Sequence, residues 1–445
     1  MTSIYKKTLL YSLAKAYMLF AFRMFYGKII IRGKENIPND SGFIIAPNHR
    51  NALMDALVAA LITPKGKTTS FLARSDLFHN KLIAKLMRFA KIMPAFRIRD
   101  GFENLTKNNE VFEECVDLLA QNQVLCIMPE GNQEIEHRLR PLAKGIFRIA
   151  FAVEQNNPKN NPLKILPVGI DFGDIEKFGK HVIINIGEPI NVRDYSTLFS
   201  ENPVAATNDL KEVLRVRLEE QMLHIDTLKY YNAIVRTLEI ADYSDPAFFI
   251  QKKDIVSAYL NRKKLSILLN KKTTLGTEPL DALSADSYNL LKKLRKRRLR
   301  ATNLNKEHKK HAINTLRTLL LTITAPLGLT GILLNFIPFQ LPVLIRKMLR
   351  VEFRGFYSSI QMALGMIIFP IYHLLQAYFI CLFYQISTAY ILLMIPLFLL
   401  TGKIGFYWYK QARCSWSIIH FLLIPKKKKE KMFLLRKQIM KTVFN

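Results

Sequence analysis

The chain contains 445 residues, half of them apolar and 22% charged, and its formal net charge is +30 at pH 7. This length allows two or three domains, and many apolar beside many charged residues indicate a soluble part joined to a membrane part. The large positive charge fits two classes of partner, nucleic acid and the anionic face of a membrane. The scattered cysteines imply neither a zinc site nor a disulfide framework and fit a reducing compartment. They are Cys115, Cys126, Cys381 and Cys414.

The N-terminal segment, residues 1–27, contains an aromatic and basic stretch from Ile4 to Tyr26. Such a stretch predicts an amphipathic helix that lies in a membrane interface, with an ordinary packed helix as the alternative. Lys15 and Arg23 interrupt its apolar residues and no small-residue cleavage site follows. We therefore expect no cleavable signal peptide.

From Lys28 to about Val192, short apolar runs alternate with helical stretches, which is typical of βαβ units around a mainly parallel sheet. We therefore predict an α/β domain over residues 28–203, with helices flanking the sheet. The predicted strands are Lys28–Arg32, Phe43–Pro47, Thr69–Ala73, Val124–Met128, Lys164–Val168 and His181–Ile186. The predicted helices are Ala52–Leu61, Leu77–Ala90, Glu103–Gln121 and Ala143–Val153.

A His and an Asp lie where the second predicted strand leads into the first of these helices, in the stretch Ala46-Pro47-Asn48-His49-Arg50-Asn51-Ala52-Leu53-Met54-Asp55. Such strand-to-helix corners are the usual place for chemistry in α/β domains. A neutral imidazole takes a proton near pH 7, and a nearby carboxylate fixes its tautomer. Because the stretch contains no Ser or Cys, we expect the proton to come from a substrate hydroxyl. The alternative is a His that caps the helix and an Asp that interacts with its dipole.

Two further segments place charged residues at strand ends. Arg97 and Arg99 lie two residues apart on an extended stretch, so their guanidinium groups point to one side and suit a phosphate. Solvent-facing charges at a sheet edge are the alternative. Glu130 and Gly131 belong to a Pro-Glu-Gly turn after a buried strand. The carboxylate there can accept hydrogen bonds from a polyol, with a plain turn as the alternative.

Two more residues complete the candidate site. Lys144 opens the next helix, whose N-terminus can help to bind an anion. Pro167 lies inside an apolar strand, where proline is disfavoured unless it shapes a sheet edge or a pocket wall. We interpret Pro167 as a pocket wall and not as a catalytic element.

Residues 204–311 show amphipathic helical spacing without strand signals, and we predict a helical accessory region. The region ends in a basic segment that out of context suits nucleic acid. Uncharged sequence begins soon after it, so we expect anionic membrane lipids and no nucleic acid as its partner. The basic residues are Lys292, Lys293, Arg295, Lys296, Arg297, Arg298, Arg300, Lys306, Lys309 and Lys310.

Residues 312–445 form the predicted membrane region with a basic C-terminal tail. No charge occurs for 28 residues in Thr318–Ile345 or for 48 residues in Gly355–Gly402, counting His373 as neutral. A helix needs ~20 residues to cross a bilayer, so a break near Phe383–Ser387 gives two spanning helices in the second run. Basic flanks on both sides of both runs belong in the cytoplasm under the positive-inside rule. This requires the first run to enter and leave by one face, as a proline-broken hairpin; a kinked span is the alternative.

The Asn-His…Asp stretch, the arginine stretch, the Pro-Glu-Gly turn and the proline-containing strand, in this order, resemble the glycerolipid acyltransferase family over residues 25–200 or so. That family joins acyl-CoA or acyl-carrier protein to glycerol 3-phosphate or lysophosphatidic acid. The resemblance implies that His49 deprotonates the acceptor hydroxyl as it attacks the thioester, and that Asp55 orients His49. It implies no metal, no covalent intermediate and no cofactor other than the acyl-donor substrate. The substrate-binding residues would be Asn48, Arg97, Arg99, Glu130, Gly131 and Lys144.

One departure concerns the spacing of the catalytic pair. Five residues separate His49 from Asp55, whereas four is the commonest number in the family. On a continuous helix the extra residue would rotate the carboxylate by ~100°. The pair can meet only if His49 lies in the loop and Asp55 in the first helical turn. This gap, the neighbouring Asn51 and the helical and membrane extension resemble the fungal-type glycerol-3-phosphate acyltransferase branch.

The sequence therefore predicts a multi-pass, membrane-bound O-acyltransferase of phospholipid synthesis with its catalytic domain on the cytoplasmic face. Its donor would be acyl-CoA or acyl-carrier protein, and its acceptor glycerol 3-phosphate. Lysophosphatidic acid or another lipid is the alternative acceptor. A non-enzymatic basic membrane scaffold is the alternative from another class of protein.

Overall fold

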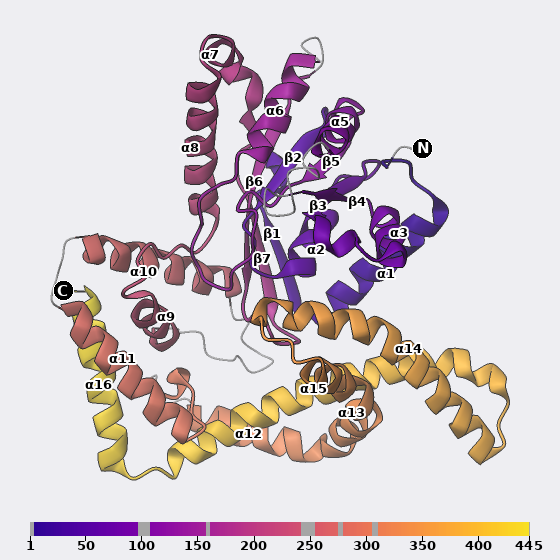
Figure 1. Cartoon of the computed structure of the whole chain (residues 1–445). Coiled ribbons are helices and arrows are strands. Elements are labelled where there is room, and N and C mark those ends of the chain that lie inside the picture. The colour runs from indigo at the N-terminus through magenta and orange to yellow at the C-terminus, as the bar shows by residue number, and fades with distance from the viewer. Residues whose placement is uncertain are drawn as a thin grey trace. The chain divides into compact units, whose positions relative to one another are not determined.

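The computed structural model of the chain, drawn in Figure 1, describes residues 4–96, 107–156, 161–241, 254–274, 279–304 and 310–444. The chain divides into two compact units. The first comprises Met1–Leu223 together with Arg346–Met366, and the second comprises His224–Ile345 together with Ile367–Asn445. A short segment late in the chain therefore folds with the N-terminal half.

One sheet organises the first unit. Its strands, in the order in which they lie side by side, are β1 (Lys28–Arg32), β7 (His181–Ile186), β6 (Lys164–Phe172), β2 (Phe43–Pro47), β5 (Val124–Cys126), β3 (Thr69–Arg74) and β4 (Ile92–Ala95). A further strand, β8 (Ile190–Asn191), pairs with β6. The pairs β6–β7 and β6–β8 are antiparallel, and the other pairs are parallel. The prediction of a mainly parallel α/β sheet is confirmed, and each of the six predicted strands is present.

Helices cover both faces of this sheet, and β2 shows how the residues divide between them. Ile44 and Ala46 face one apolar core, while Phe43 and Ile45 face the other. Burial on both faces explains why this strand is continuously apolar. The first core receives side chains from α5 (Lys107–Ala120), α6 (Gly145–Asn156) and α8 (Pro203–Gln221). The second receives them from α1 (Leu9–Phe25), α2 (Ala52–Ile62) and the start of α14 (Tyr357–Tyr384).

The boundary of the first unit differs from the one expected at residue 203. Leu210, Leu214 and Leu218 of α8 recur every fourth residue, and all three are fully buried in the first core. A helix with such a stripe buries it against the sheet. The first unit therefore continues to Leu223. Its remaining helices are α3 (Lys81–Phe89) and α7 (Ser196–Glu201).

The second unit contains helices and no strand among its described residues. Before the predicted membrane region these are α9 (Tyr231–Ile240), α10 (Ile255–Thr274) and α11 (Pro279–Lys296). The predicted membrane region contains α12 (Lys310–Ile323), α13 (Ala325–Met348), the later part of α14, α15 (Ile391–Leu422) and α16 (Lys426–Phe444). Three stretches of the described chain are long and apolar enough to cross a membrane: Ala325–Met348, Arg354–Tyr384 and Thr388–Leu422. The break predicted near Phe383–Ser387 coincides with the end of α14.

The proline break predicted within 318–345 is wrong, because Ala325–Met348 form the continuous 24-residue helix α13, which follows α12. The entry and exit of this run by one face stay a prediction. Pro338 lies inside this helix and leaves the carbonyl of Leu334 without its helical N–H donor. The side chain of Gln376 on α14 supplies the missing bond, its Nε2 donating to the Leu334 oxygen over 3.4 Å. A neighbouring helix thus satisfies the backbone that the proline frees, as is common in membrane helices.

Candidate active site

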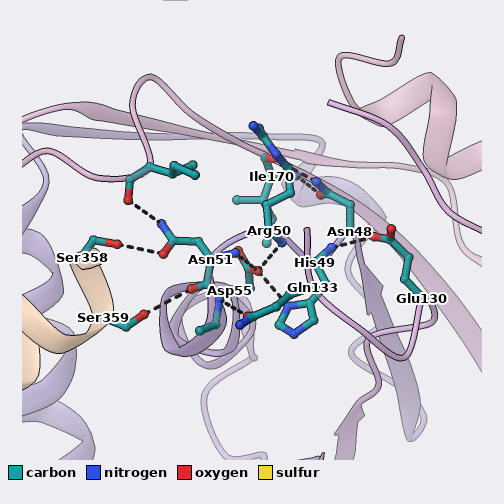
Figure 2. Close-up of polar contacts among 12 residues, drawn as sticks. Asn48, His49, Arg50, Asn51, Asp55, Glu130, Gln133, Ile170, Ser358 and Ser359 are labelled. Carbon is teal, nitrogen blue, oxygen red and sulfur yellow. Dashed lines mark hydrogen bonds and ion pairs between the residues drawn. The ribbon is translucent and has the colours of Figure 1, made fainter. Parts of the chain in front are cut away.

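The predicted His–Asp pair is formed at the corner between β2 and α2. His49 lies in the loop after β2, and Asp55 lies in the first turn of α2. Nδ1 of His49 is 2.9 Å from Oδ2 of Asp55, and the Asp55 side chain is fully buried while His49 is 18% exposed. These are the positions that the five-residue gap requires for contact. Figure 2 shows the imidazole of His49 beside Asp55, joined to it by this contact.

The same carboxylate oxygen also folds the loop. Oδ2 of Asp55 accepts hydrogen bonds from the backbone N–H groups of Arg50, over 2.8 Å, and Asn51, over 2.7 Å. Asp55 therefore holds both the ring and the backbone that follows it. Ala52 turns the chain into α2 with a φ of 37°, which is unfavourable for a residue with a Cβ atom. Its N–H donates to Oε1 of Gln133, which helps to hold the turn.

Asn48 fixes the end of β2 against β6 (Figure 2). Its Oδ1 accepts from the N–H of Ile170 over 2.6 Å, and its Nδ2 donates to the carbonyl of the same residue over 3.3 Å. The side chain is 1% exposed. Its amide extends the strand pairing by one residue, so the structure gives Asn48 a part in placing His49, in addition to the predicted part in substrate binding.

Glu130 holds His49 from the opposite side. The backbone N–H of His49 donates to Oε1 of Glu130 over 2.8 Å, while Oε2 accepts from the backbone N and the Nε of Arg140 over 3.2 and 3.1 Å. Burial raises the pKa of Glu130 above the ordinary value, and the bonds from His49 and Arg140 oppose part of that rise. The sequence predicts a carboxylate fixed at the top of the sheet. In the structure, this carboxylate of Glu130 also binds the backbone of His49, the predicted base.

The remaining predicted residues lie as follows. Gly131 has a φ of 69°, a conformation that glycine adopts readily, and a Cβ atom there would contact Ala143. Lys144 is exposed and directly precedes α6. The N–H of Ala143 donates to the carbonyl of Pro129 over 2.7 Å, which places Lys144 beside the Pro-Glu-Gly turn. Arg97 and Arg99 lie outside the described residues.

Pro167 is buried within β6, between β2 and β7. Its carbonyl accepts from the N–H of Gly187 over 2.9 Å, at the break between β7 and β8. In a strand the N and O of one residue point to the same side. The nitrogen of Pro167, which carries no hydrogen, therefore faces this break, where the strand pairing needs no donor. The residue is therefore tolerated inside the sheet, and its part as a pocket wall stays a prediction.

Sequence reasoning missed several residues that hold the corner. Arg50 is 6% exposed, and its Nε and Nη2 donate to the carbonyl of Ile135 over 3.1 and 2.6 Å. Ser358 and Ser359 on α14 bond to Asn51. Arg50 was adjacent to the predicted base and could have been found by its position. The serines lie in an apolar run and give no local signal.

This arrangement suits proton transfer by the ring nitrogen that faces away from Asp55. An ionised Asp55 favours the tautomer in which Nδ1 of His49 carries the proton, which leaves Nε2 as the acceptor. The described hydrogen bonds fix the ring through Nδ1 and the backbone through its N–H. The site can therefore act as a positioned general base toward a hydroxyl brought to Nε2.

Comparisons with known proteins agree with this chemistry. Residues 28–171 match the family model "Acyltransferase", which covers every strand from β1 to β5 and most of β6. The chain is 27% identical over 206 residues to the 1-acyl-sn-glycerol-3-phosphate acyltransferase of Bacillus subtilis, spanning 45% of this chain and 92% of that protein. It is 28% identical over 104 residues to the glycerol-3-phosphate O-acyltransferase 1 of Saccharomyces cerevisiae, spanning 23% of this chain and only 14% of that protein.

Among solved structures, the 1-acyl-sn-glycerophosphate acyltransferase of Thermotoga maritima matches with a TM-score of 0.34 and 21% identity. The match covers 47% of this chain and 79% of that chain. The family match and the His–Asp corner that it contains identify residues 28–171 as an acyltransferase domain, and the chain as an O-acyltransferase.

Proposed function

We propose that this enzyme transfers a fatty acyl group from acyl-CoA or acyl-carrier protein to a hydroxyl of glycerol 3-phosphate, a step of phospholipid synthesis. The observation that carries the proposal is the 2.9 Å contact between Nδ1 of His49 and the buried carboxylate of Asp55. It orients Nε2 of His49 as a base within a domain of the acyltransferase family.

The reaction needs one proton to move twice. Nε2 of His49 takes the proton from the acceptor hydroxyl as the oxygen attacks the thioester carbonyl. The tetrahedral intermediate collapses, the carbon–sulfur bond breaks, and the thiolate takes the proton from the imidazolium. An ester and a free thiol result, and Asp55 stabilises the transient imidazolium throughout. General-base assistance of this kind contributes about 10²–10⁴-fold to the rate, and alignment of the two bound substrates contributes more.

Lysophosphatidic acid is the second candidate acceptor, because the B. subtilis relative is named for that substrate and aligns over most of its length. Both acceptors carry a phosphate, for which Lys144 beside the Pro-Glu-Gly turn and the predicted Arg97 and Arg99 are suited. The five-residue gap between His49 and Asp55 favours glycerol 3-phosphate through the resemblance to the fungal-type branch.

An acceptor panel tests the proposal. The full-length protein in detergent or vesicles is given one radiolabelled acyl thioester with glycerol 3-phosphate, lysophosphatidic acid or a non-phosphorylated glycerolipid. We expect labelled product with glycerol 3-phosphate and its loss in His49→Ala, with the exposed His79→Ala as the matched control. Transfer by His49→Ala at the wild-type rate would refute the role of the base. Product with lysophosphatidic acid alone would replace the proposed acceptor.

We also propose that the enzyme is held in the membrane by α14 and α15, with the first unit on the cytoplasmic face. Residues 4–223 and 346–366 belong to one folded unit, so they lie on one side of the membrane. The chain between them then crosses an even number of times. In the described part of that interval, α13 is the one helix long and apolar enough to cross. We therefore expect α13 not to cross the membrane, so that both of its ends lie on the same side as the first unit.

Cysteine accessibility tests this topology, and the four native cysteines are all buried. Single cysteines are introduced by Lys65→Cys in the first unit, Arg350→Cys between α13 and α14, and Ser387→Cys between α14 and α15. An impermeant thiol reagent is added to sealed vesicles of either orientation. We expect positions 65 and 350 to react from the cytoplasmic side and position 387 from the other side. Labelling of positions 65 and 350 from opposite sides would overturn the proposal.

A further inference from the structure

The start of α14 reaches the catalytic corner from a distant part of the chain. Oγ of Ser358 donates to Oδ1 of Asn51 over 2.8 Å, although the two residues are 307 positions apart in the chain. Oγ of Ser359 lies 3.4 Å from the carbonyl oxygen of the same Asn51. Ser358 and Asn51 are fully buried, and Ser359 is 6% exposed. Figure 2 shows both serines on the α14 ribbon, directed at Asn51.

Asn51 is the link between these serines and the catalytic pair. Its backbone N–H donates to Oδ2 of Asp55 over 2.7 Å, the same oxygen that holds Nδ1 of His49. Its Nδ2 donates to the hydroxyl of Tyr26 and to the carbonyl of Ile175, each over 3.3 Å. Burial raises the pKa of Tyr26 far above its ordinary value, so this hydroxyl stays protonated. Every polar group of Asn51 is thus bonded, and buried networks of this kind fix one geometry.

Other contacts anchor the start of α14 to the first unit. Arg354 forms an ion pair with Glu176. A Cβ atom on Gly355 would lie 3.0 Å from the carbonyl oxygen of Arg50, so the segment passes close to the loop backbone. Met362 is buried in the second core.

A last contact lies one turn further along α14. The hydroxyl of Tyr17 on α1 donates to the carbonyl of Met366 over 2.5 Å. Pro370 leaves this carbonyl without its helical N–H donor, and Tyr17 replaces that donor. The segment from Arg354 to Met366 is therefore fixed at both ends, and Ser358 is held against Asn51 by more than its own bond.

We propose that Ser358 is a positioning residue for the catalytic pair, acting through Asn51 on Asp55 and His49. Ser358 fixes the Asn51 amide, the Asn51 backbone donates to Asp55, and Asp55 holds the imidazole. The loop after β2 and the helix α2 supply the catalytic pair, and the start of α14 supplies a further hydrogen bond that holds its geometry. This inference rests on the proposed role of His49 as the base.

The variant Ser358→Ala in the full-length protein tests the inference. Because the bond acts on the geometry of the base, we expect kcat to fall about 10-fold with KM for donor and acceptor unchanged. Ser200→Ala is the matched control, because Ser200 is an exposed helical serine that donates only to a carbonyl of its own turn. The near-isosteric Ser358→Cys, whose thiol is a weak donor, should give an intermediate kcat. It serves as the test if Ser358→Ala does not fold.

A second measurement separates positioning from general destabilisation. Residues that act as one unit are non-additive, so Ser358→Ala should cause no further loss of kcat in an Asp55→Asn background. An equal fold-loss in both backgrounds, or wild-type kcat in Ser358→Ala and Ser358→Cys, would overturn the inference. His49→Ala is assayed alongside. Activity retained in His49→Ala refutes the proposed function, whereas loss in His49→Ala with none in Ser358→Ala refutes only the positioning role.

Discussion

Glu130 and His49 are joined through the backbone, the N–H of His49 donating to Oε1 of Glu130 over 2.8 Å. Asp55 holds the ring of His49 from α2, and Glu130 holds its main chain from the turn after β5. The base is therefore fixed by two carboxylates from two elements. The second oxygen of Glu130 binds Arg140, which ties the following loop to the same point.

The variant Glu130→Gln should lower activity without abolishing it. An amide keeps one acceptor oxygen, so it can serve the N–H of His49 or Arg140 but not both. We expect kcat to fall about 10-fold, since small displacements of a base are costly, with a smaller change in KM for the acyl donor. Glu134→Gln, at an exposed carboxylate on the same loop, is the control and should keep wild-type kcat. Equal kcat in both variants would contradict the role given to Glu130.

The raised pKa of Glu130 predicts a pH dependence of stability. The folded state binds this proton more tightly than the unfolded chain, because burial penalises the carboxylate. The resulting stabilisation is fully present below the ordinary glutamate pKa, near 4.3, and is lost as the pH rises through the raised folded-state pKa. Thermal unfolding should therefore show the Tm of wild type minus that of Glu130→Gln decreasing as the pH rises from about 4. A difference that increases with pH over this window would contradict the direction of the shift.

Much of the fold could be predicted because its strands are continuously apolar runs between helical stretches. Exceptions were β4 and β8. Ile92–Ala95 is a four-residue edge strand with mixed burial, and Ile190–Asn191 has only two residues. Neither has enough buried side chains to produce a pattern. A continuous helix α13 was only the alternative prediction, as a kinked span, for another reason: its prolines suggested a break, and the donor that compensates Pro338 comes from a different helix.

The catalytic corner could be predicted because its chemistry is local. His49 and Asp55 are six positions apart, and this spacing allows contact only if His49 lies in the loop and Asp55 in the first helical turn. The structure meets this condition. The bond of Ser358 to Asn51 could not be predicted, because it depends on how a late segment packs on the sheet. Likewise, nothing in a Pro-Glu-Gly turn indicates that Glu130 will bind the backbone of His49.

The variant Asp55→Asn should remove both the orientation of the base and an anchor of the loop. Oδ2 of Asp55 accepts from Nδ1 of His49 and from the N–H groups of Arg50 and Asn51. We expect kcat to fall by roughly 10²–10⁴-fold, the range for a lost general base, with little change in KM. Stability should fall by about 1–3 kcal/mol if the amide leaves a buried donor unpaired. Asp40→Asn, at an exposed carboxylate, is the control for both measurements, and equal kcat in the two variants would exclude Asp55 from catalysis.

The variant Lys144→Gln tests the predicted anion site at the start of α6. Lys144 is exposed beside the Pro-Glu-Gly turn, so its charge is free to attract a phosphorylated acceptor, and exposed ion pairs are worth about 0.2–1 kcal/mol. We expect KM for glycerol 3-phosphate to rise about 2- to 5-fold with kcat unchanged, and the difference to shrink at high salt. Lys65→Gln removes one charge at another exposed position and should leave KM unchanged. A fall in kcat with constant KM would place Lys144 in the chemical step and not in binding.

The close packing of α13 and α15 provides a test within the second unit. A Cβ atom on Gly331 would lie 2.1 Å from the carbonyl oxygen of Thr401, so only glycine allows this approach. Asn335 spans the same contact, its Nδ2 donating to the carbonyl of Phe398 over 3.2 Å, and small residues with such polar links are typical of helix packing in membranes. Gly331→Ala should therefore separate the helices and lower the Tm of the detergent-solubilised protein. Gly145→Ala, at a helical glycine with open space around it, should leave the Tm unchanged or raise it. Equal Tm values for the two variants would show that α13 and α15 do not pack through Gly331.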